Sequence, residues 1–174
     1  ERVILFFGFI RRYKGLDILL DALKILVSEG KADRLKLLIA GEFYEDEKNY
    51  RGWLDDPALR GHLVLHTHFI SDSEVRYYLC AADCVVQPYR HATQSGVTPL
   101  AYHFEKPMIV TRVGGLPSLV PDGEVGLIAE PDAKSIAAKI EEYFRLGEDF
   151  FLPHLRNEKK KYSWKAMTEA IVNT

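Results

Sequence analysis

The 174 residues carry 23 Lys and Arg against 25 Asp and Glu, so the formal net charge is −2, and 47% of the residues are hydrophobic. This is the composition of an ordinary globular chain, which argues against disorder and against wholesale binding of nucleic acid. No apolar run approaches the length of about 20 residues that spans a bilayer. The two cysteines, Cys80 and Cys84, are too few for a disulfide framework or a four-ligand metal site, and we expect both to be small core residues.

The length predicts one domain with a sizeable core. The sequence opens inside an apolar run, Val3 to Phe7, with no initiator Met and no signal peptide. A chain that begins inside a strand is expected to be a piece of a longer protein. Any cleft that needs two domains is then expected to be only half present.

Apolar runs alternate with segments of helical periodicity along most of the chain. In chain order, the sequence predicts a strand at 3–7, a helix at 16–27, a strand at 35–41, a helix at 44–55, a strand at 62–69, a helix at 72–82, a strand at 83–89, a helix at 95–104, strands at 107–113 and 126–130, and helices at 133–145 and 163–173. Ser71 and Glu74 have the spacing of a capping box, and Ser163 is the expected N-cap of the last helix. A charged stretch at 157–161 leads into the last helix, and the lysines at 159–161 within it are expected to form a solvated helix face or a linker.

Short, almost continuously apolar strands that alternate with helices indicate a parallel sheet covered on both faces. The predicted fold class is therefore α/β, a Rossmann-like three-layer domain around a parallel sheet of about six strands. In such sheets ligands bind beyond the carboxyl ends of the strands. Functional residues are expected in the strand-to-helix turns at 8–15, 41–44, 67–71, 88–96 and 112–118.

The first of these turns places three cations between two glycines, directly before a helix. It begins at Gly8 and contains Arg11, Arg12 and Lys14. It lacks the G-x-G-x-x-G fingerprint, so a dinucleotide site loses its main support. Backbone N–H groups, the helix dipole and the clustered cations together suit a phosphate. The alternative is a basic loop that is simply solvated.

The turn after the fourth strand is rich in polar residues. It contains Thr93, Gln94, Ser95 and Gly96 where a helix is expected to begin. Thr93 and Ser95 can cap that helix, and Gly96 lets a ligand approach the backbone closely. The pattern predicts an anion cradle, with a plain helix cap as the alternative.

Two further patterns lie at the same edge of the predicted sheet. Gly114 and Gly115 form a turn that tolerates positive φ, either beside a ligand or as a simple loop. His66 and His68 share one face of a strand, but no Cys, Asp or Glu lies in that strand to complete a metal site. We therefore expect two polar residues at a strand end and no metal.

Several motifs occur in a characteristic order. They are the G-x₅-K-G turn, IAG, AADCVVQPY, KPMIVTRVGGLPSLV, GLIAEP and YSW. Taken together they resemble the C-terminal domain of retaining glycosyltransferases of the GT-B fold, in the large family 4, also called group 1. The resemblance covers essentially the whole chain. It implies that residues 1–174 are a single Rossmann-like domain that binds a nucleotide-diphospho-sugar, as one half of a GT-B fold.

By this resemblance, Lys14 matches the lysine that holds the donor diphosphate, and Gly8 the glycine that opens its loop. The family commonly has an arginine directly after that glycine, where this sequence has Phe9. Arg11 or Arg12 is expected to supply the missing charge. The expected catalytic residues are Lys14 and Arg12, which would stabilise the leaving diphosphate.

At the positions that contact the donor sugar in the family, this sequence differs in part. Gly114 and Gly115 match the family's Gly-Gly loop near the donor sugar and phosphates. The family's paired glutamates, which contact the donor sugar and the ribose, fall on Ala92 and Leu100, whose side chains accept no hydrogen bond. Residues 93–97, the cradle segment, are expected to replace them. The replacing groups are the side chains of Thr93, Gln94 and Ser95 and the amides of Ser95, Gly96 and Val97.

The resemblance implies a donor domain that, in the full-length protein, transfers a sugar to a saccharide or lipid-linked acceptor with retention of configuration. No Asp-x-Asp motif is present, so the donor site is expected to be metal-independent and to need no cofactor. The acceptor would bind the missing N-terminal half, on which the helix at 163–173 is expected to dock, and this chain alone is expected to be inactive. The implied location is the cytoplasm, with association at the inner membrane face left open and no nucleic-acid partner.

Two other functions stay open at this point. The lost glutamates favour a non-catalytic module that binds a nucleotide-sugar or a sugar phosphate. A sugar epimerase of related GT-B architecture is the third candidate. Turnover with and without an acceptor would separate the three.

Overall fold

The computed structural model describes residues 1–92 and 95–162. Within these residues the chain forms one six-stranded sheet in the order β3-β2-β1-β4-β5-β6, and every neighbouring pair is parallel. The strands are β1 (Arg2–Phe7), β2 (Leu35–Ala40), β3 (Leu63–His66), β4 (Cys84–Gln87), β5 (Met108–Thr111) and β6 (Gly126–Ala129). The predicted α/β class and strand count are confirmed.

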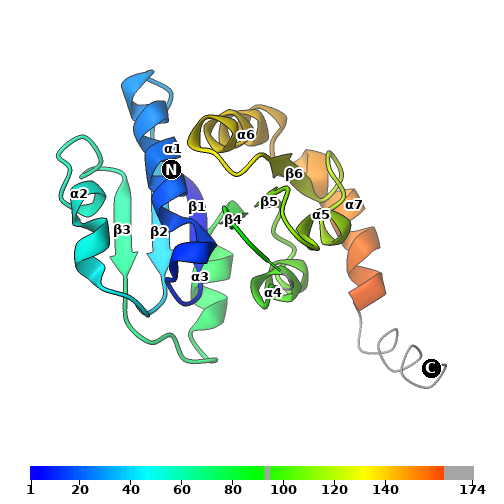
Figure 1. The fold of residues 1–174 in the computed structure, drawn as a ribbon. Helices are drawn as coiled ribbons and strands as arrows, with labels where there is room; N and C mark the ends of the chain where they lie inside the picture. The colour runs from blue at the N-terminus through cyan, green and yellow to red at the C-terminus, as the bar shows by residue number, and fades with distance from the viewer. Residues whose placement is uncertain (93–94, 163–174) are drawn as a thin grey trace.

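Helices cover both faces of this sheet (Figure 1). They are α1 (Leu16–Ser28), α2 (Arg51–Leu54), α3 (Val75–Ala81), α4 (Val97–His103), α5 (Leu116–Leu119), α6 (Ala133–Leu146) and α7 (Glu148–Lys159), with 3₁₀ turns η1 (Arg12–Lys14), η2 (Glu47–Tyr50) and η3 (Lys160–Tyr162). Different helices cover the two faces of the sheet. Helices α1 and α6 pack on one face, while α3, α4 and α5 pack on the other.

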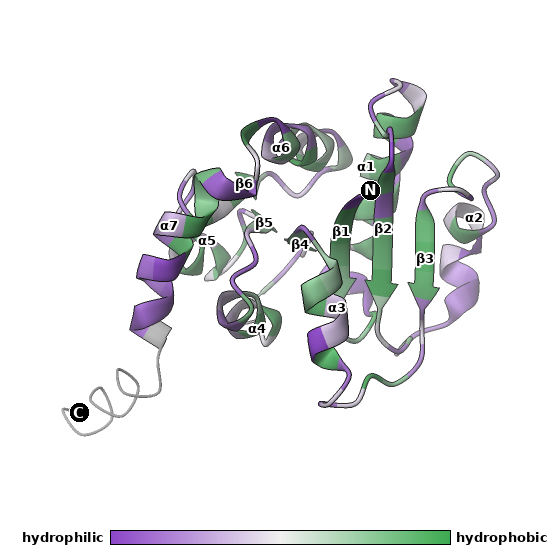
Figure 2. Ribbon diagram, turned by 180° about the vertical axis from the view of Figure 1, so that it is seen from behind, coloured by the Kyte–Doolittle hydropathy of each residue, from purple (hydrophilic) through white to green (hydrophobic). Residues whose placement is uncertain are grey.

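The side chains of β1 point alternately to the two faces of the sheet, and this explains the three layers. Ile4 and Phe6 pack with α1 and α6, and Leu5 between them packs with α3 and α4. Successive side chains of a strand point to opposite faces, so a continuous apolar strand must be covered on both sides. Figure 2 shows the apolar strands at the centre and the polar residues on the outer faces of the helices. Among the described residues, no helix is both long enough and apolar enough to cross a bilayer.

Two local predictions are wrong, and one helix was not predicted. The helix expected at 44–55 is replaced by η2 and the short α2, and Phe43, before them, is extended in a parallel bridge with Ile10. The helix α7 was not predicted. Its buried face is small, Phe151 and Leu155, and Pro153 stands inside it, which is unfavourable for a helix. Cys80 is exposed on α3, whereas Cys84 is buried as expected.

The charged residues 157–161 form the end of α7 and most of η3. They are therefore part of a helical segment rather than a linker. Lys159 reaches back to the main-chain carbonyl of His103 at 3.0 Å, which ties this end of the chain to α4. The helix predicted at 163–173 lies outside the described residues.

Helix α6 offers a test of the local folding signals. The Asp132 carboxylate accepts a hydrogen bond from the Ser135 amide at 2.7 Å, as expected of an N-cap residue. We expect Asp132→Ala to lower the free energy of unfolding by about 1 kcal/mol, measured by urea denaturation, because the Ser135 amide in the first turn of the helix loses its side-chain acceptor. Asp132→Asn keeps an acceptor and should stay close to the parent. An unchanged midpoint for Asp132→Ala would show that the cap contributes nothing.

Candidate functional site

The strand-to-helix turns are packed tightly against one another at the carboxyl edge of the sheet. At Gly15, which has φ +70°, an added Cβ would lie 1.9 Å from the Pro88 carbonyl oxygen. At Gly114, with φ +50°, an added Cβ would lie 1.5 Å from the Ala92 carbonyl oxygen. Only glycine allows such approaches. The turn after β1 and the turn after β5 therefore both contact the segment that follows β4.

Arg90 strengthens the first of these contacts. Its backbone N–H donates to the Tyr13 carbonyl at 2.7 Å, and its Nη1 donates to the Arg12 carbonyl at 2.9 Å. Its guanidinium also forms a bidentate pair with Asp17, at 2.7 and 2.6 Å. Burial alone would raise the pKa of the Asp17 carboxyl, but the hydrogen bonds and the charge of Arg90 hold that pKa below its ordinary value of 3.8. The turn that carries Lys14 is thus fixed to the segment after β4.

The Asp17–Arg90 pair predicts a pH dependence of stability. Since folding lowers the pKa of Asp17, the contribution of the pair is fully present above the unfolded value and is lost as pH falls through the lower folded value. We expect Asp17→Asn to be less stable than the parent near about pH 6, with the difference shrinking below about pH 4. Denaturant titrations across this range measure it. A difference that stays constant down to about pH 2 would contradict the assignment.

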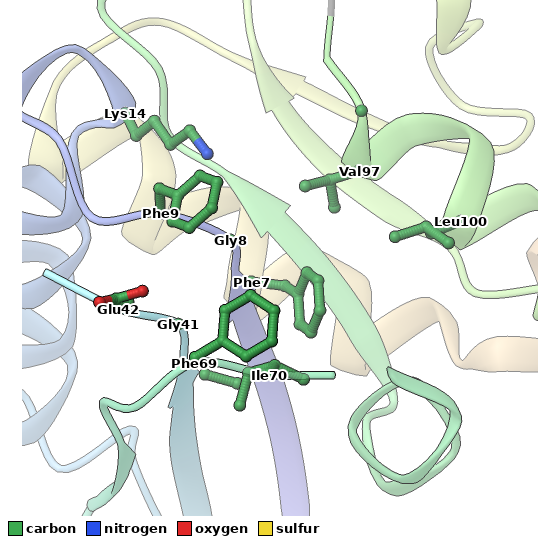
Figure 3. Close-up of a pocket in the computed structure, with 12 residues that line it drawn as sticks. Phe7, Gly8, Phe9, Lys14, Gly41, Glu42, Phe69, Ile70, Val97 and Leu100 are labelled. Carbon is green, nitrogen blue, oxygen red and sulfur yellow. The ribbon is translucent and has the colours of Figure 1, made fainter. Parts of the chain in front are cut away.

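A cavity of about 240 Å³ opens at this edge of the sheet (Figure 3). It lies between the turns that follow β1, β2 and β3 and the first turn of α4. Its lining residues are Phe7, Gly8, Phe9, Lys14, Ala40, Gly41, Glu42, Phe69, Ile70, Gly96, Val97 and Leu100.

Four of the predicted site residues therefore come together here, and five other described ones do not line the cavity. Gly8, Lys14, Gly96 and Val97 line the cavity. The predicted residues that are not among its described lining residues are Arg11, Arg12, Ser95, Gly114 and Gly115. Thr93 and Gln94 lie outside the described residues.

Lys14 is the one cation among the described lining residues. Its Nζ lies 6.0 Å from the centroid of the Phe9 ring, and no described carboxylate forms an ion pair with it. Burial, and after it the charge of Arg11, lower the pKa of Lys14 from its ordinary value of 10.5. An ammonium that is partly buried without an anion favours a ligand that supplies one.

The predicted cluster of cations is divided. The guanidinium of Arg11 lies 4.7 Å from the centroid of the Tyr44 ring, outside the lining. Arg12 is exposed, and its carbonyl accepts from Arg90. Phe9, in the place where an arginine was expected, stacks on Tyr44 with centroids 4.1 Å apart and an angle of 19°. Arg11 and Lys14 thus lie against different rings of this stacked pair.

The cradle segment is only partly as expected. The buried hydroxyl of Ser95 donates to Gln87 Oε1 at 2.5 Å and accepts from the Val97 amide at 3.2 Å. Gln87 also contacts Thr98, at 3.2 Å. The Ser95 hydroxyl therefore belongs to a buried polar network at the start of α4, a structural role close to the alternative interpretation, and the Val97 amide already has an acceptor. Gly96 is exposed and faces the cavity.

Sequence reasoning missed the remaining lining residues, including Glu42, Phe69 and Ile70. The sequence predicts that the turns containing these residues lie at the ligand edge of the sheet, but no pattern in those turns identifies a ligand-binding residue. Leu100, in the place of a family glutamate, does line the cavity and presents only carbon to it.

Gly115 and His66 make contacts within the protein. Gly115 is the N-cap residue of α5, and its carbonyl accepts from Ser118 Oγ at 2.8 Å. The ring centroids of His66 and His68 are 6.0 Å apart, and His66 Nδ1 lies 3.2 Å from the Tyr78 hydroxyl. In the described part of the chain, no group of three or more His, Cys, Asp and Glu side chains could hold a metal ion.

Comparison with known proteins gives a consistent result. A family described as "Glycosyl transferases group 1" matches residues 1–145. The capsular polysaccharide biosynthesis glycosyltransferase CapM of Staphylococcus aureus is 34% identical over 144 residues, which is 80% of this chain and 36% of CapM. An uncharacterized glycosyltransferase of Methanocaldococcus jannaschii is 30% identical over 171 residues, which is 92% of this chain and 44% of that protein.

Solved structures share the fold. The structure of Anabaena HepE in complex with UDP superimposes with a TM-score of 0.79 at 17% identity, over 98% of this chain and 47% of that one. The chain thus spans less than half of the length of the proteins compared here.

Proposed function

We propose that this chain, which belongs to the family of glycosyl transferases group 1, is the donor-binding half of a glycosyltransferase whose cavity holds a nucleotide-diphospho-sugar. The observation that carries the proposal is Lys14, a partly buried ammonium without a described anionic partner in a cavity at the carboxyl edge of the sheet. A parallel sheet binds ligands at this edge. The diphosphate of the donor would supply the missing anion.

In the proposed reaction, the bond between the sugar and the diphosphate breaks, and negative charge develops on the leaving nucleoside diphosphate. Lys14 would stabilise that charge, and the cavity is already arranged for it because Arg90 holds the turn of Lys14 in place. We propose that this cation removes the need for a metal ion. Retention of configuration is proposed from the family alone.

The acceptor, a saccharide or a lipid-linked molecule, would come from a second half of the protein. A cavity of about 240 Å³ is smaller than most ligand sites, which measure about 300–1,000 Å³, and this supports a site that a second domain completes. HepE was solved with UDP, so uridine diphosphate is the first nucleotide to test.

The test separates binding from transfer. We expect saturable binding of at least one of UDP, GDP and ADP in calorimetry, with the same affinity in the presence of Mg²⁺ and of EDTA. We expect no sugar transfer by residues 1–174 alone. Absence of binding by all three nucleotides would contradict the proposed function, and transfer by this chain alone would contradict the need for a second half.

A further inference from the structure

A second charged side chain lines the same cavity. Glu42 is the one carboxylate among its 12 described lining residues. The main-chain carbonyl of Glu42 accepts from the Ile10 amide at 2.9 Å, which fixes the backbone at this point. The carboxylate itself makes no hydrogen bond or ion pair with any residue that the structure describes. Because an ionised carboxylate only accepts hydrogen bonds, it favours a ligand group that donates them.

The strand order places Glu42 between two different environments. Lys14 follows β1, Glu42 follows β2, and Phe69 and Ile70 follow β3, which are neighbouring strands in the order β3-β2-β1. Along the edge of the sheet the cavity therefore passes from a cation, past a carboxylate, to an apolar end (Figure 3). A nucleoside diphosphate has the same order of groups: phosphates, a ribose with two hydroxyls, and a flat base.

The wall formed by α4 provides no competing acceptor. Val97 and Leu100 face the cavity from α4, on the other side of the turn after β1 from Glu42, and their side chains contain only carbon (Figure 3). Gly96 adds no side chain. Among the described lining residues, Glu42 is thus the side chain that can accept hydrogen bonds from a sugar hydroxyl.

We propose that Glu42 accepts hydrogen bonds from the 2′- and 3′-hydroxyls of the nucleotide ribose, and so makes this cavity selective for ribonucleotides. This inference rests on the proposed function, since it needs a nucleoside diphosphate in the cavity. A carboxylate acceptor makes stronger hydrogen bonds than a neutral one, so loss of the diol should be clearly measurable.

The experiment is a cycle of two ligands and two proteins. The tightest binder among UDP, GDP and ADP is compared with its 2′,3′-dideoxy analogue, by calorimetry, on the parent chain and on Glu42→Ala. We expect the parent to prefer the ribonucleotide by about tenfold or more, and Glu42→Ala to bind the two ligands within about twofold of each other. Inorganic pyrophosphate, which has no ribose, should bind both proteins alike or bind the variant slightly more tightly.

Two further variants serve as controls for this experiment. Glu42→Gln keeps the shape with a weaker acceptor and should show an intermediate preference. Glu47→Ala removes an exposed carboxylate that is not among the described lining residues and should keep the full preference of the parent. The inference is overturned if the parent shows no preference for the ribose, or if Glu42→Ala and Glu42→Gln retain it in full. If no nucleoside diphosphate binds the parent, the proposed function itself fails, which is a different outcome.

Discussion

Replacing Lys14 by alanine is expected to weaken the binding of a nucleoside diphosphate by about ten- to a hundredfold. A hydrogen bond to a charged group contributes roughly 1.5–3 kcal/mol, and each ~1.4 kcal/mol is a factor of ten in affinity. The upper part of this range is favoured because the Lys14 side chain is partly buried and has no described anion that would compete for it. Calorimetry with UDP and with pyrophosphate measures the loss, which should be similar for both ligands.

Lys48→Ala is the matched control. It removes an exposed lysine from η2 that is not among the described lining residues, so affinity should stay within about twofold of the parent. Equal affinity of Lys14→Ala and the parent would refute the role of Lys14.

The lowered pKa of Lys14 adds a pH signature. Because the pKa lies below the ordinary value of 10.5, the unliganded chain loses this positive charge at a lower pH than an ordinary lysine would. Affinity for the diphosphate should therefore fall as pH rises through the alkaline range. In Lys14→Arg the charge persists, because a guanidinium stays protonated, so its affinity should remain level over the same range. A parent whose affinity is also level up to about pH 10 would contradict this assignment.

The general architecture could be predicted from the sequence because it depends on local signals. Each strand is a short apolar run and each long helix has its own periodicity, so element type and order follow from neighbouring residues. The failures have other causes. Phe43 is extended in a bridge with Ile10, a contact between residues distant in sequence that local periodicity does not show, and the helical turns begin only at Glu47. Helix α7 has few buried apolar residues and contains Pro153, so its pattern is weak.

A site residue could be predicted from the sequence only where the residues of its own turn mark it as a ligand contact. Lys14 stands between two glycines before a helix, and that pattern is visible in eight residues, 8–15. Glu42 carries no such pattern. Its importance depends on the order β3-β2-β1, which places its turn beside that of Lys14, and strand order is a property of the folded sheet. Likewise, the aromatic stack of Phe9 on Tyr44 joins two turns that the sequence separates.

Ser95 shows the opposite error. A row of polar residues at a ligand edge suggested hydrogen bonds to a ligand, but the Ser95 hydroxyl is occupied by Gln87 and by the Val97 amide. Gln87 lies in a strand that is otherwise apolar, and a buried amide must be satisfied within the protein. A polar residue in a central strand is therefore a sign that nearby polar residues serve the interior.

The largest effect is expected at Gly96, which faces the cavity from the start of α4. Its φ is −68°, and no atom of the described residues lies within 4 Å of a Cβ added there, so a side chain at this position meets neither backbone strain nor a steric clash with the described part of the chain. The added bulk would instead occupy space that a ligand needs. We expect Gly96→Val to reduce binding of nucleoside diphosphates by about a hundredfold or more, while the free energy of unfolding changes by less than about 1 kcal/mol.

Gly61→Val is the matched control for this substitution. Gly61 is also exposed, has no described atom within 4 Å of an added Cβ, and is not among the described lining residues. It should bind nucleotide as the parent does. Gly114→Ala shows the opposite case, a glycine where an added side chain clashes with the protein. Its Cβ would lie 1.5 Å from the Ala92 carbonyl oxygen, so this variant should lose stability before binding can be measured. If Gly96→Val folds and binds UDP as tightly as the parent, the phosphates do not approach the start of α4, and the cradle segment has only its structural role.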